Sequence, residues 1–123
     1  MILVDTSVWI EHLRSASAIL TELLGDGQVL VHPFVLGELA LGSLRQRDVF
    51  LSDLRDLPQA VVATDGEVLS LIDRRTLFGR GIGYVDAHLL AAARLTAGSK
   101  LWTHDRRLQA VAAQLDLAAV LSQ

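Results

Sequence analysis

Cysteine is absent from this 123-residue sequence, proline occurs twice, and aromatic residues make up 5%. Without cysteine the chain forms no disulfides and has neither a thiol nucleophile nor a cysteine-based zinc site. The start, Met1–Asp5, lacks the basic segment and cleavage site of a signal peptide. No apolar stretch approaches the ~20 residues of a membrane span. These absences predict a cytoplasmic protein with no membrane segment.

The length and composition predict one folded domain over residues 1–123. Hydrophobic residues account for 51% of the chain, which excludes a disordered protein. A chain of this size can bury a single core of ordinary dimensions.

Charge is unevenly distributed along the sequence. The net charge of −3 argues weakly against a nucleic-acid partner, but residues 1–73 hold four basic and eleven acidic residues, whereas residues 74–107 hold seven basic and two acidic ones. The basic segment suits a polyanion. The alternative is that these arginines only solvate helix faces. The seven are Arg74, Arg75, Arg80, Arg94, Lys100, Arg106 and Arg107.

Strand and helix patterns alternate, which predicts an α/β fold: a parallel-sheet α/β/α sandwich with helices on both faces. Thr64 and Glu67 form a predicted capping box, and the glycines of residues 79–83 predict a loop. The predicted strands are 1–4, 29–31, 60–63, 100–102 and an edge strand over 117–120. The predicted helices begin near 7 and at 33, and cover 17–24, 49–57, 65–78, 85–96 and 105–115.

Four acidic residues interrupt apolar segments, where a folded chain normally avoids acid because carboxylates are rarely buried unless they are paired or bind a metal. Asp5 and Asp105 each follow a predicted strand, so both are expected at the carboxyl edge of the sheet, where sites form. Asp86 opens an alanine-rich helix beside the same edge. Glu38 lies inside an apolar helix.

Such a group of carboxylates would repel one another unless a hard divalent cation bound them, and all-oxygen ligation favours Mg2+ or Mn2+ over zinc. Each acid also has a simpler explanation, with one exception. Asp5 and Asp105 are placed to cap helices, and Asp86 is a favourable charge in a first turn. Glu38 has no such explanation, because a carboxylate in an apolar environment costs stability.

The order and spacing of these motifs resemble a PIN-domain ribonuclease, and the short chain resembles the VapC toxins of toxin–antitoxin pairs. The resemblance rests on Met1–Ser7, an acid in the helix after Pro33, Tyr84–Ala87 and Trp102–Asp105. Two positions depart from the commonest pattern. His32 stands where Ser or Thr often precedes the proline, and Gly83 stands where Ser or Thr often caps the next helix.

The resemblance implies a metal-dependent endoribonuclease that uses Mg2+ or Mn2+. It implies that Asp5, Glu38, Asp86 and Asp105 are the catalytic and metal-binding residues and that Thr6 and Thr103 support them. Its implied partners are RNA and a cognate VapB-type antitoxin, and it implies a homodimer. From their position in the basic segment, Arg80, Arg106 and Arg107 are hypothesised to bind RNA.

Two other functions are considered. A non-catalytic PIN-like subunit would bind or regulate a partner. A phosphoaspartyl phosphatase also carries an aspartate after its first strand, but it needs a second acid two residues later, where this sequence has Ser7. The four histidines show no paired metal spacing, so surface or capping roles are expected for them.

Overall fold

Three short parallel strands form the centre of the protein, in a computed structural model that describes residues 1–121. Ser122 and Gln123, the end of the predicted 1–123 domain, lie outside the described residues. The strands are β1 (Ile2–Val4), β2 (Val29–Leu30) and β3 (Lys100–Trp102), in the order β2-β1-β3. Ile2 pairs with Val29 on one side, and Val4 pairs with Trp102 on the other. The predicted parallel sheet is confirmed.

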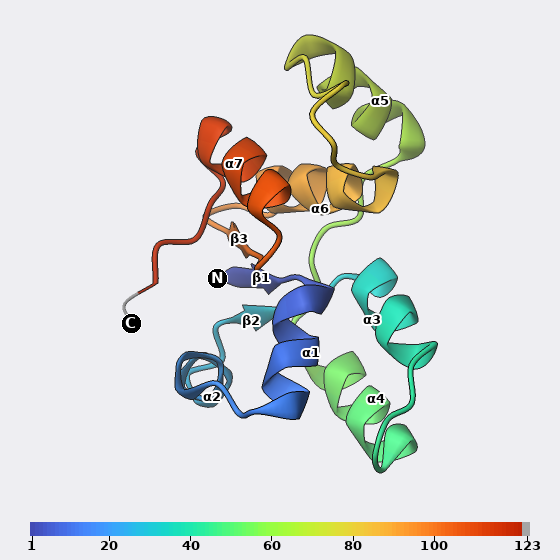
Figure 1. Cartoon of the computed structure of the whole chain (residues 1–123), viewed down its shortest axis with the longest axis vertical. Coiled ribbons are helices and arrows are strands. Elements are labelled where there is room, and N and C mark those ends of the chain that lie inside the picture. The colour runs from blue at the N-terminus through green and yellow to red at the C-terminus, as the bar shows by residue number, and fades with distance from the viewer. Residues whose placement is uncertain (122–123) are drawn as a thin grey trace.

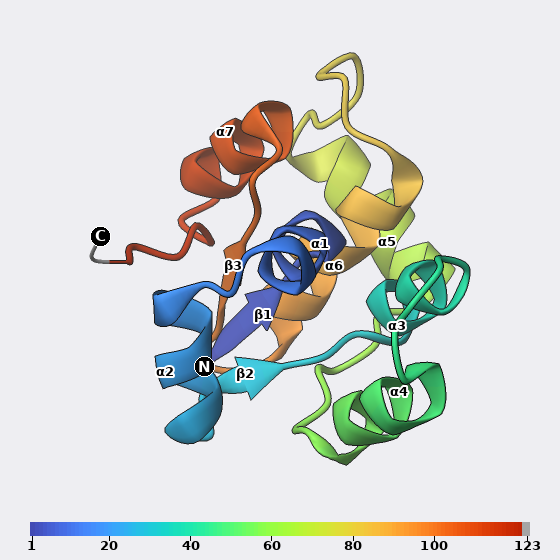
Figure 2. The same ribbon diagram turned by 60° about the horizontal axis from the view of Figure 1, so that its bottom comes forward.

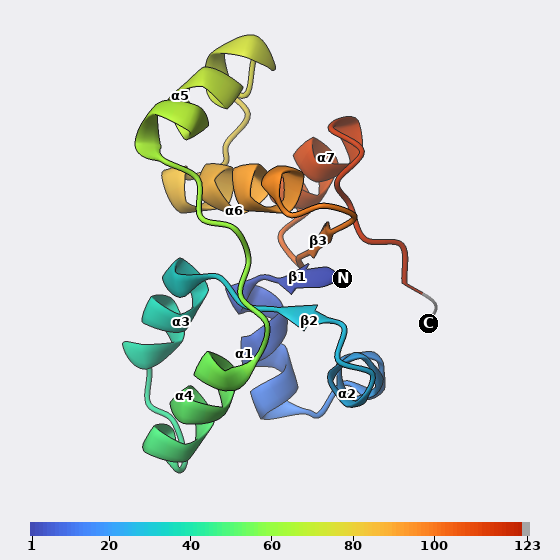
Figure 3. The ribbon, with the colours of Figure 1, turned by 180° about the vertical axis from the view of Figure 1, so that it is seen from behind.

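Seven helices surround this sheet within residues 1–121, on both of its faces. In Figures 1 and 3, α6 and α7 lie above the strands, and α1 extends below β1. The strands between them are buried, with Leu3 and Leu101 fully enclosed. The predicted α/β/α sandwich is therefore confirmed. The helices are α1 (Thr6–Arg14), α2 (Ala18–Gly25), α3 (Pro33–Ala40), α4 (Arg47–Asp56), α5 (Asp65–Arg74), α6 (Tyr84–Leu95) and α7 (Arg106–Gln114).

The carboxyl ends of the strands share one edge, and four helices begin beside it. The strand arrows point to this edge in Figures 1 and 2, where α1, α3, α6 and α7 start. Helix amino ends carry partial positive charge from unpaired N–H groups, which favours anions. The edge therefore suits both carboxylates and a phosphate. None of the helices in residues 1–121 combines the length and apolar character that a membrane span requires.

Two of the predicted strands are wrong. The segment 60–63 forms no strand, and its only sheet contact in the described chain is a single bridge between Val31 and Gln59 just before it. The ladder stops because the next donor opposite Ala60 would be Pro33, which has no amide hydrogen and begins α3. The Val61 amide donates to the Thr96 hydroxyl at 2.9 Å. Residues 117–120 likewise make only a bridge, between Leu101 and Ala118, and Val120 is 97% exposed.

Helix α5 ends four residues earlier than the predicted Phe78. Thr76 adopts a left-handed φ of 55°, and the Leu77 amide donates to the Ile72 carbonyl at 3.0 Å. This arrangement is a Schellman ending with threonine in the position that glycine usually takes. At the other end of α5, the predicted capping box between Thr64 and Glu67 is confirmed.

Candidate active site

Asp5 is the most buried of the four acids, with 7% of its surface exposed. Its backbone amide donates to the Trp102 carbonyl at 2.9 Å, so the residue extends the pairing of β1 with β3. Although Asp5 precedes α1, its side chain makes no capping hydrogen bond. Its Oδ2 instead accepts hydrogen bonds from Ser7 and Thr103, each at 2.7 Å. The capping explanation for Asp5 is therefore wrong.

Two hydroxyl groups hold Asp5 and join both ends of the chain. Each hydroxyl donates to Asp5 and also accepts from a backbone amide. Ser7 Oγ accepts from the His104 amide at 3.0 Å, and Thr103 Oγ1 accepts from the Asp105 amide at 3.0 Å. The start of α1 and the turn from β3 to α7 are thus fastened around one buried carboxylate. Thr103 was predicted to support the site, whereas Ser7 was missed. Its place two residues after Asp5, in the first turn of the same helix, was the sequence feature that could have revealed it.

Glu38 reaches the same region from α3. Its Oε1 accepts a hydrogen bond of 2.6 Å from the hydroxyl of Thr6, the first residue of α1. This contact joins α3 to the start of α1, so the predicted supporting residue Thr6 lies against an acid of the group. Glu38 is exposed, however. The expectation that Glu38 lies in an apolar environment and lowers the stability of the fold is therefore wrong, because its side chain points to the open sheet edge.

Asp86 lies in the first turn of α6 and is half-buried. Its Oδ2 accepts from the Gly83 amide at 3.0 Å, so the carboxylate closes the turn that precedes the helix. Burial raises the pKa of the Asp86 carboxyl, and the nearby negative charges of Asp5, Asp105 and Glu38 raise it further, against the opposing effect of the Gly83 amide. The structure thus brings the four predicted acids within electrostatic reach of one another.

Asp105 completes the group from the turn after β3. It is exposed, and its Oδ1 accepts from the Leu108 amide at 3.0 Å as the N-cap of α7. The capping explanation is therefore correct for this residue. The cap uses only Oδ1, so it does not explain the role of the second carboxylate oxygen, Oδ2.

The same arrangement recurs at all four acids. One carboxylate oxygen of each is fixed by a hydroxyl or an amide, and the other has no hydrogen-bond partner within residues 1–121. Four fixed carboxylates, each with an unused oxygen, form a donor set of the kind that a hard divalent cation prefers. Within the described part of the chain, no three acidic or histidine side chains stand close enough to hold one ion between them. Mg2+ commonly keeps several of its waters, so this spacing fits ligation partly through water.

The predicted RNA-binding arginines lie beside the loop that leads into α6. Arg80 is half-buried and donates to the Gln114 side chain at 2.6 Å, which ties the loop to α7. Arg106 and Arg107 are exposed in the first turn of α7. Gly81 has a φ of +79°, and a Cβ there would stand 2.8 Å from two atoms of the Arg107 side chain. Only glycine fits this position without displacing the arginine.

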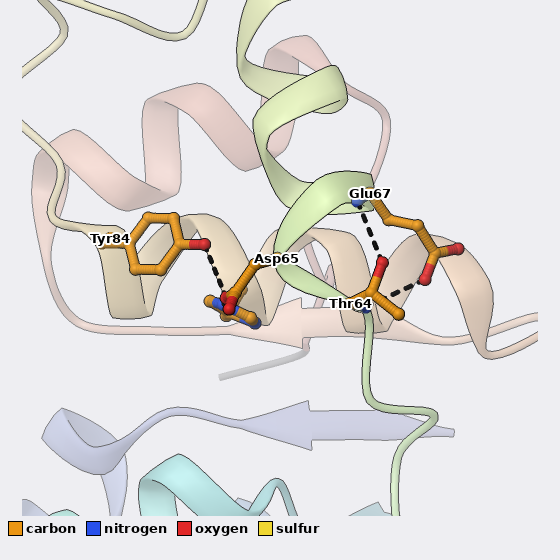
Figure 4. A network of polar contacts seen from close by, with 5 residues as sticks. Thr64, Asp65, Glu67 and Tyr84 are labelled. Atoms are coloured by element: carbon orange, nitrogen blue, oxygen red, sulfur yellow. Dashed lines mark hydrogen bonds and ion pairs between the residues drawn. The ribbon is translucent and has the colours of Figure 1, made fainter.

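A second polar network ties the beginning of α6 to α5. Asp65 accepts a hydrogen bond of 2.7 Å from the Tyr84 hydroxyl and contacts His88 Nε2 at 3.1 Å, and Figure 4 shows this junction of α5 with α6. The Tyr84 and His88 hydrogen bonds lower the pKa of the Asp65 carboxyl. The network therefore holds the helix that carries Asp86.

Two histidines take structural places. His88 is buried, which corrects its expected surface role, because the contact with Asp65 satisfies one of its ring nitrogens. His32 caps α3 as expected, by accepting from the Phe34 amide at 3.0 Å. Burial, with the neighbouring His88, lowers the pKa of His32 to about 4.

Comparison with known proteins identifies the family. The PIN domain family matches residues 2–114. The chain belongs to the PIN-domain family. Two relatives, both named Ribonuclease VapC32, come from Mycobacterium tuberculosis strains CDC 1551 / Oshkosh and ATCC 25618 / H37Rv. Each is 58% identical over 118 residues, which cover 96% of this chain and 95% of the relative. The resemblance to VapC-type PIN-domain ribonucleases is thereby confirmed.

Proposed function

We propose that this PIN domain is a metal-dependent endoribonuclease that acts as the toxin of a type II toxin–antitoxin pair. The observation that carries the proposal is the set of four carboxylates at one sheet edge, each with one oxygen fixed and one unused. The relatives named Ribonuclease VapC32 support ribonuclease activity on the same scaffold. Residues 1–123 are proposed to act as a single domain.

The four acids are proposed to divide the work according to their burial and contacts. Asp5 and Asp86, the two that are at least half-buried, would hold a cation most directly. Glu38 and Asp105 are exposed. They would bind the cation through water or orient the side chains that hold it. Thr6 and Thr103, with Ser7, keep the carboxylates in place. Mg2+ or Mn2+ would supply a water of lowered pKa and neutralise charge on the phosphodiester.

Two alternatives are less well supported. Membership of the PIN-domain family, together with a serine hydroxyl rather than an acid at position 7, argues against a phosphoaspartyl phosphatase. A non-catalytic PIN-like subunit would have no need of four acids with unused oxygens. Asp86 in particular has a raised pKa because burial and the other three charges act on it, and stability alone would not favour such a group.

A comparison of RNA ends in cells tests the activity. Brief expression of the wild type should create new RNA ends that are missing after expression of Asp5→Asn, a variant that keeps an oxygen able to accept from Ser7 and Thr103. Identical RNA ends from both proteins would support the non-catalytic alternative.

The proposed partner is a VapB-type antitoxin, and a groove beside the acids suits it. Ile10, Leu13 and Leu44 line a hollow of about 350 Å³ together with Glu38. Ile10 and Leu13 are 47% and 46% exposed. An apolar segment seated there would cover these side chains and could direct a basic residue towards Glu38. We also propose that the protein forms a homodimer and that it cleaves RNA in the cytoplasm.

A further inference from the structure

Three arginines outside the candidate active site converge on one hollow between α5 and α6. Arg74 lies in the last turn of α5, Arg75 follows it, and Arg94 lies in the last turn of α6. With Leu71 they line a small hollow, and Arg74 and Arg94 also line a groove of about 400 Å³ that continues between the two helices. All three arginines are exposed. Figure 3 shows α5 rising away from α6 on this side.

No carboxylate neutralises this cluster within residues 1–121, since none of the three side chains takes part in an ion pair there. The acid among the groove residues is Glu67, and its Oε1 turns back to accept from the Thr64 amide at 2.9 Å. Figure 4 shows this capping arrangement. Asp73, the neighbour of Arg74, is exposed and makes no ion pair in the described chain.

A structural role explains only part of the arrangement. One arginine near the carboxyl end of each helix interacts favourably with the helix dipole. That effect does not require the arginines of two helices to line the same hollow, where their positive charges repel one another. An anion placed between them removes the repulsion, and a guanidinium binds phosphate through two parallel hydrogen bonds.

We propose that Arg74, Arg75 and Arg94 bind a backbone phosphate of the RNA substrate at a distance from the cleavage centre; this rests on the proposed ribonuclease function. Asp86 and Arg94 are eight residues apart on α6, which corresponds to roughly 12 Å along the helix axis. The cluster is therefore too distant to touch the scissile phosphate. An RNA strand a few nucleotides longer than the cleaved linkage would reach both places.

The test measures the salt dependence of RNA binding, in an Asp5→Asn background that prevents cleavage. Arg74→Ala/Arg94→Ala is compared with Arg45→Ala/Arg55→Ala, which removes the same charge from two exposed arginines elsewhere. With a long single-stranded RNA, the first pair should weaken binding several-fold and flatten the slope by about 0.7 for each lost phosphate contact. Arg74→Lys/Arg94→Lys should keep most of the slope, since its charge is unchanged. Equal slopes for the first pair and the control pair would overturn the inference.

A cleavage assay without the Asp5 change separates this inference from the proposed function. The Arg74→Ala/Arg94→Ala protein should cleave a trinucleotide at the wild-type rate but a long RNA less efficiently, through a raised KM. Wild-type protein that cleaves neither RNA would overturn the proposed function itself. Wild-type cleavage of both, with no defect in the double variant, would overturn only the distant phosphate contact. A variant that binds RNA normally but loses antitoxin affinity would assign the hollow to an acidic protein segment instead and would likewise overturn the inference.

Discussion

The Thr103 hydroxyl donates a buried hydrogen bond of 2.7 Å to Oδ2 of Asp5, across 98 positions of sequence. Thr103→Val removes this donor while nearly preserving shape, and it leaves a buried carboxylate with Ser7 as its remaining hydroxyl partner. Loss of a hydrogen bond to a buried charged group costs about 1.5–3 kcal/mol. We expect a loss of unfolding free energy near the lower figure, measured by urea denaturation, together with slower RNA cleavage.

Thr103→Ser is the matched control for this prediction, because it keeps the hydroxyl and loses only a methyl group. It should restore cleavage and most of the stability. If Thr103→Ser proves as inactive as Thr103→Val, the methyl packing matters rather than the hydrogen bond to Asp5.

The raised pKa of Asp86 predicts a pH-dependent stability in the metal-free protein. The folded state holds the Asp86 proton more tightly than the unfolded state does. Protonated Asp86 therefore adds to the free energy of unfolding. This contribution is complete below the ordinary carboxyl pKa of 3.8 and is lost as pH rises through the raised pKa. Without metal, Asp86→Asn should therefore melt no lower than wild type at neutral pH. The difference should disappear in acid. A variant that melts well below wild type at neutral pH would show that ionised Asp86 stabilises the fold.

Divalent cations should reverse the loss of stability that ionised Asp86 causes in the metal-free protein. Mg2+ or Mn2+ should raise the wild-type melting temperature, since a ligand that binds only the folded state stabilises it. Asp5→Asn and Asp86→Asn should weaken this response and abolish cleavage. The increase should grow as pH rises through the Asp86 titration, because ligating carboxylates must be ionised. Undiminished RNA cleavage in excess chelator would contradict a metal-dependent mechanism.

The sequence was sufficient for those acids whose positions follow from backbone topology. Asp5 comes directly after β1 and Asp105 lies three residues after β3, and parallel neighbouring strands end at one edge. Side-chain direction was not predictable in the same way. An apolar neighbourhood in sequence suggested that Glu38 was buried, yet its side chain reaches the Thr6 hydroxyl at the open edge.

Contacts between segments far apart in the sequence explain the other errors. Ser7 was missed because its partners include the His104 amide, which local patterns do not place nearby. The predicted strand over 60–63 failed because the segment it would pair with turns into α3 at Pro33, which has no amide hydrogen to continue the pairing. Which segments meet depends on the packed fold and leaves no periodic pattern in the sequence.

The arginines beside the α6 loop should guide RNA towards the four acids. Simultaneous replacement of Arg80, Arg106 and Arg107 by alanine should weaken RNA binding and flatten its salt slope by about 0.7 or less for each lost contact on single strands. Metal-induced stabilisation should survive, since none of the three is a proposed ligand. Unchanged affinity and slope would show that these arginines only solvate their helix and loop.

Gly81→Ala offers an independent route to the same readout. The new Cβ would meet the Arg107 side chain at 2.8 Å in a backbone conformation with φ of +79°. The variant should displace Arg107 and weaken RNA binding in the same direction as loss of that arginine. Normal binding by Gly81→Ala would argue that Arg107 is not an RNA contact in its observed position.

The groove beside Glu38 should bind the antitoxin. Leu13→Glu places a charge among the apolar residues that line the groove, and Leu13 is already 46% exposed, so the fold should tolerate the change. The variant should lose at least tenfold in affinity for the product of the neighbouring antitoxin gene, measured by titration calorimetry, because a buried unpaired carboxylate is costly. Its ribonuclease activity should persist, so co-expressed antitoxin should no longer relieve growth arrest. Leu69→Glu, at a leucine that is 54% exposed on α5 away from the groove, is the matched control. Equal antitoxin affinity for the two variants would place the partner on another surface.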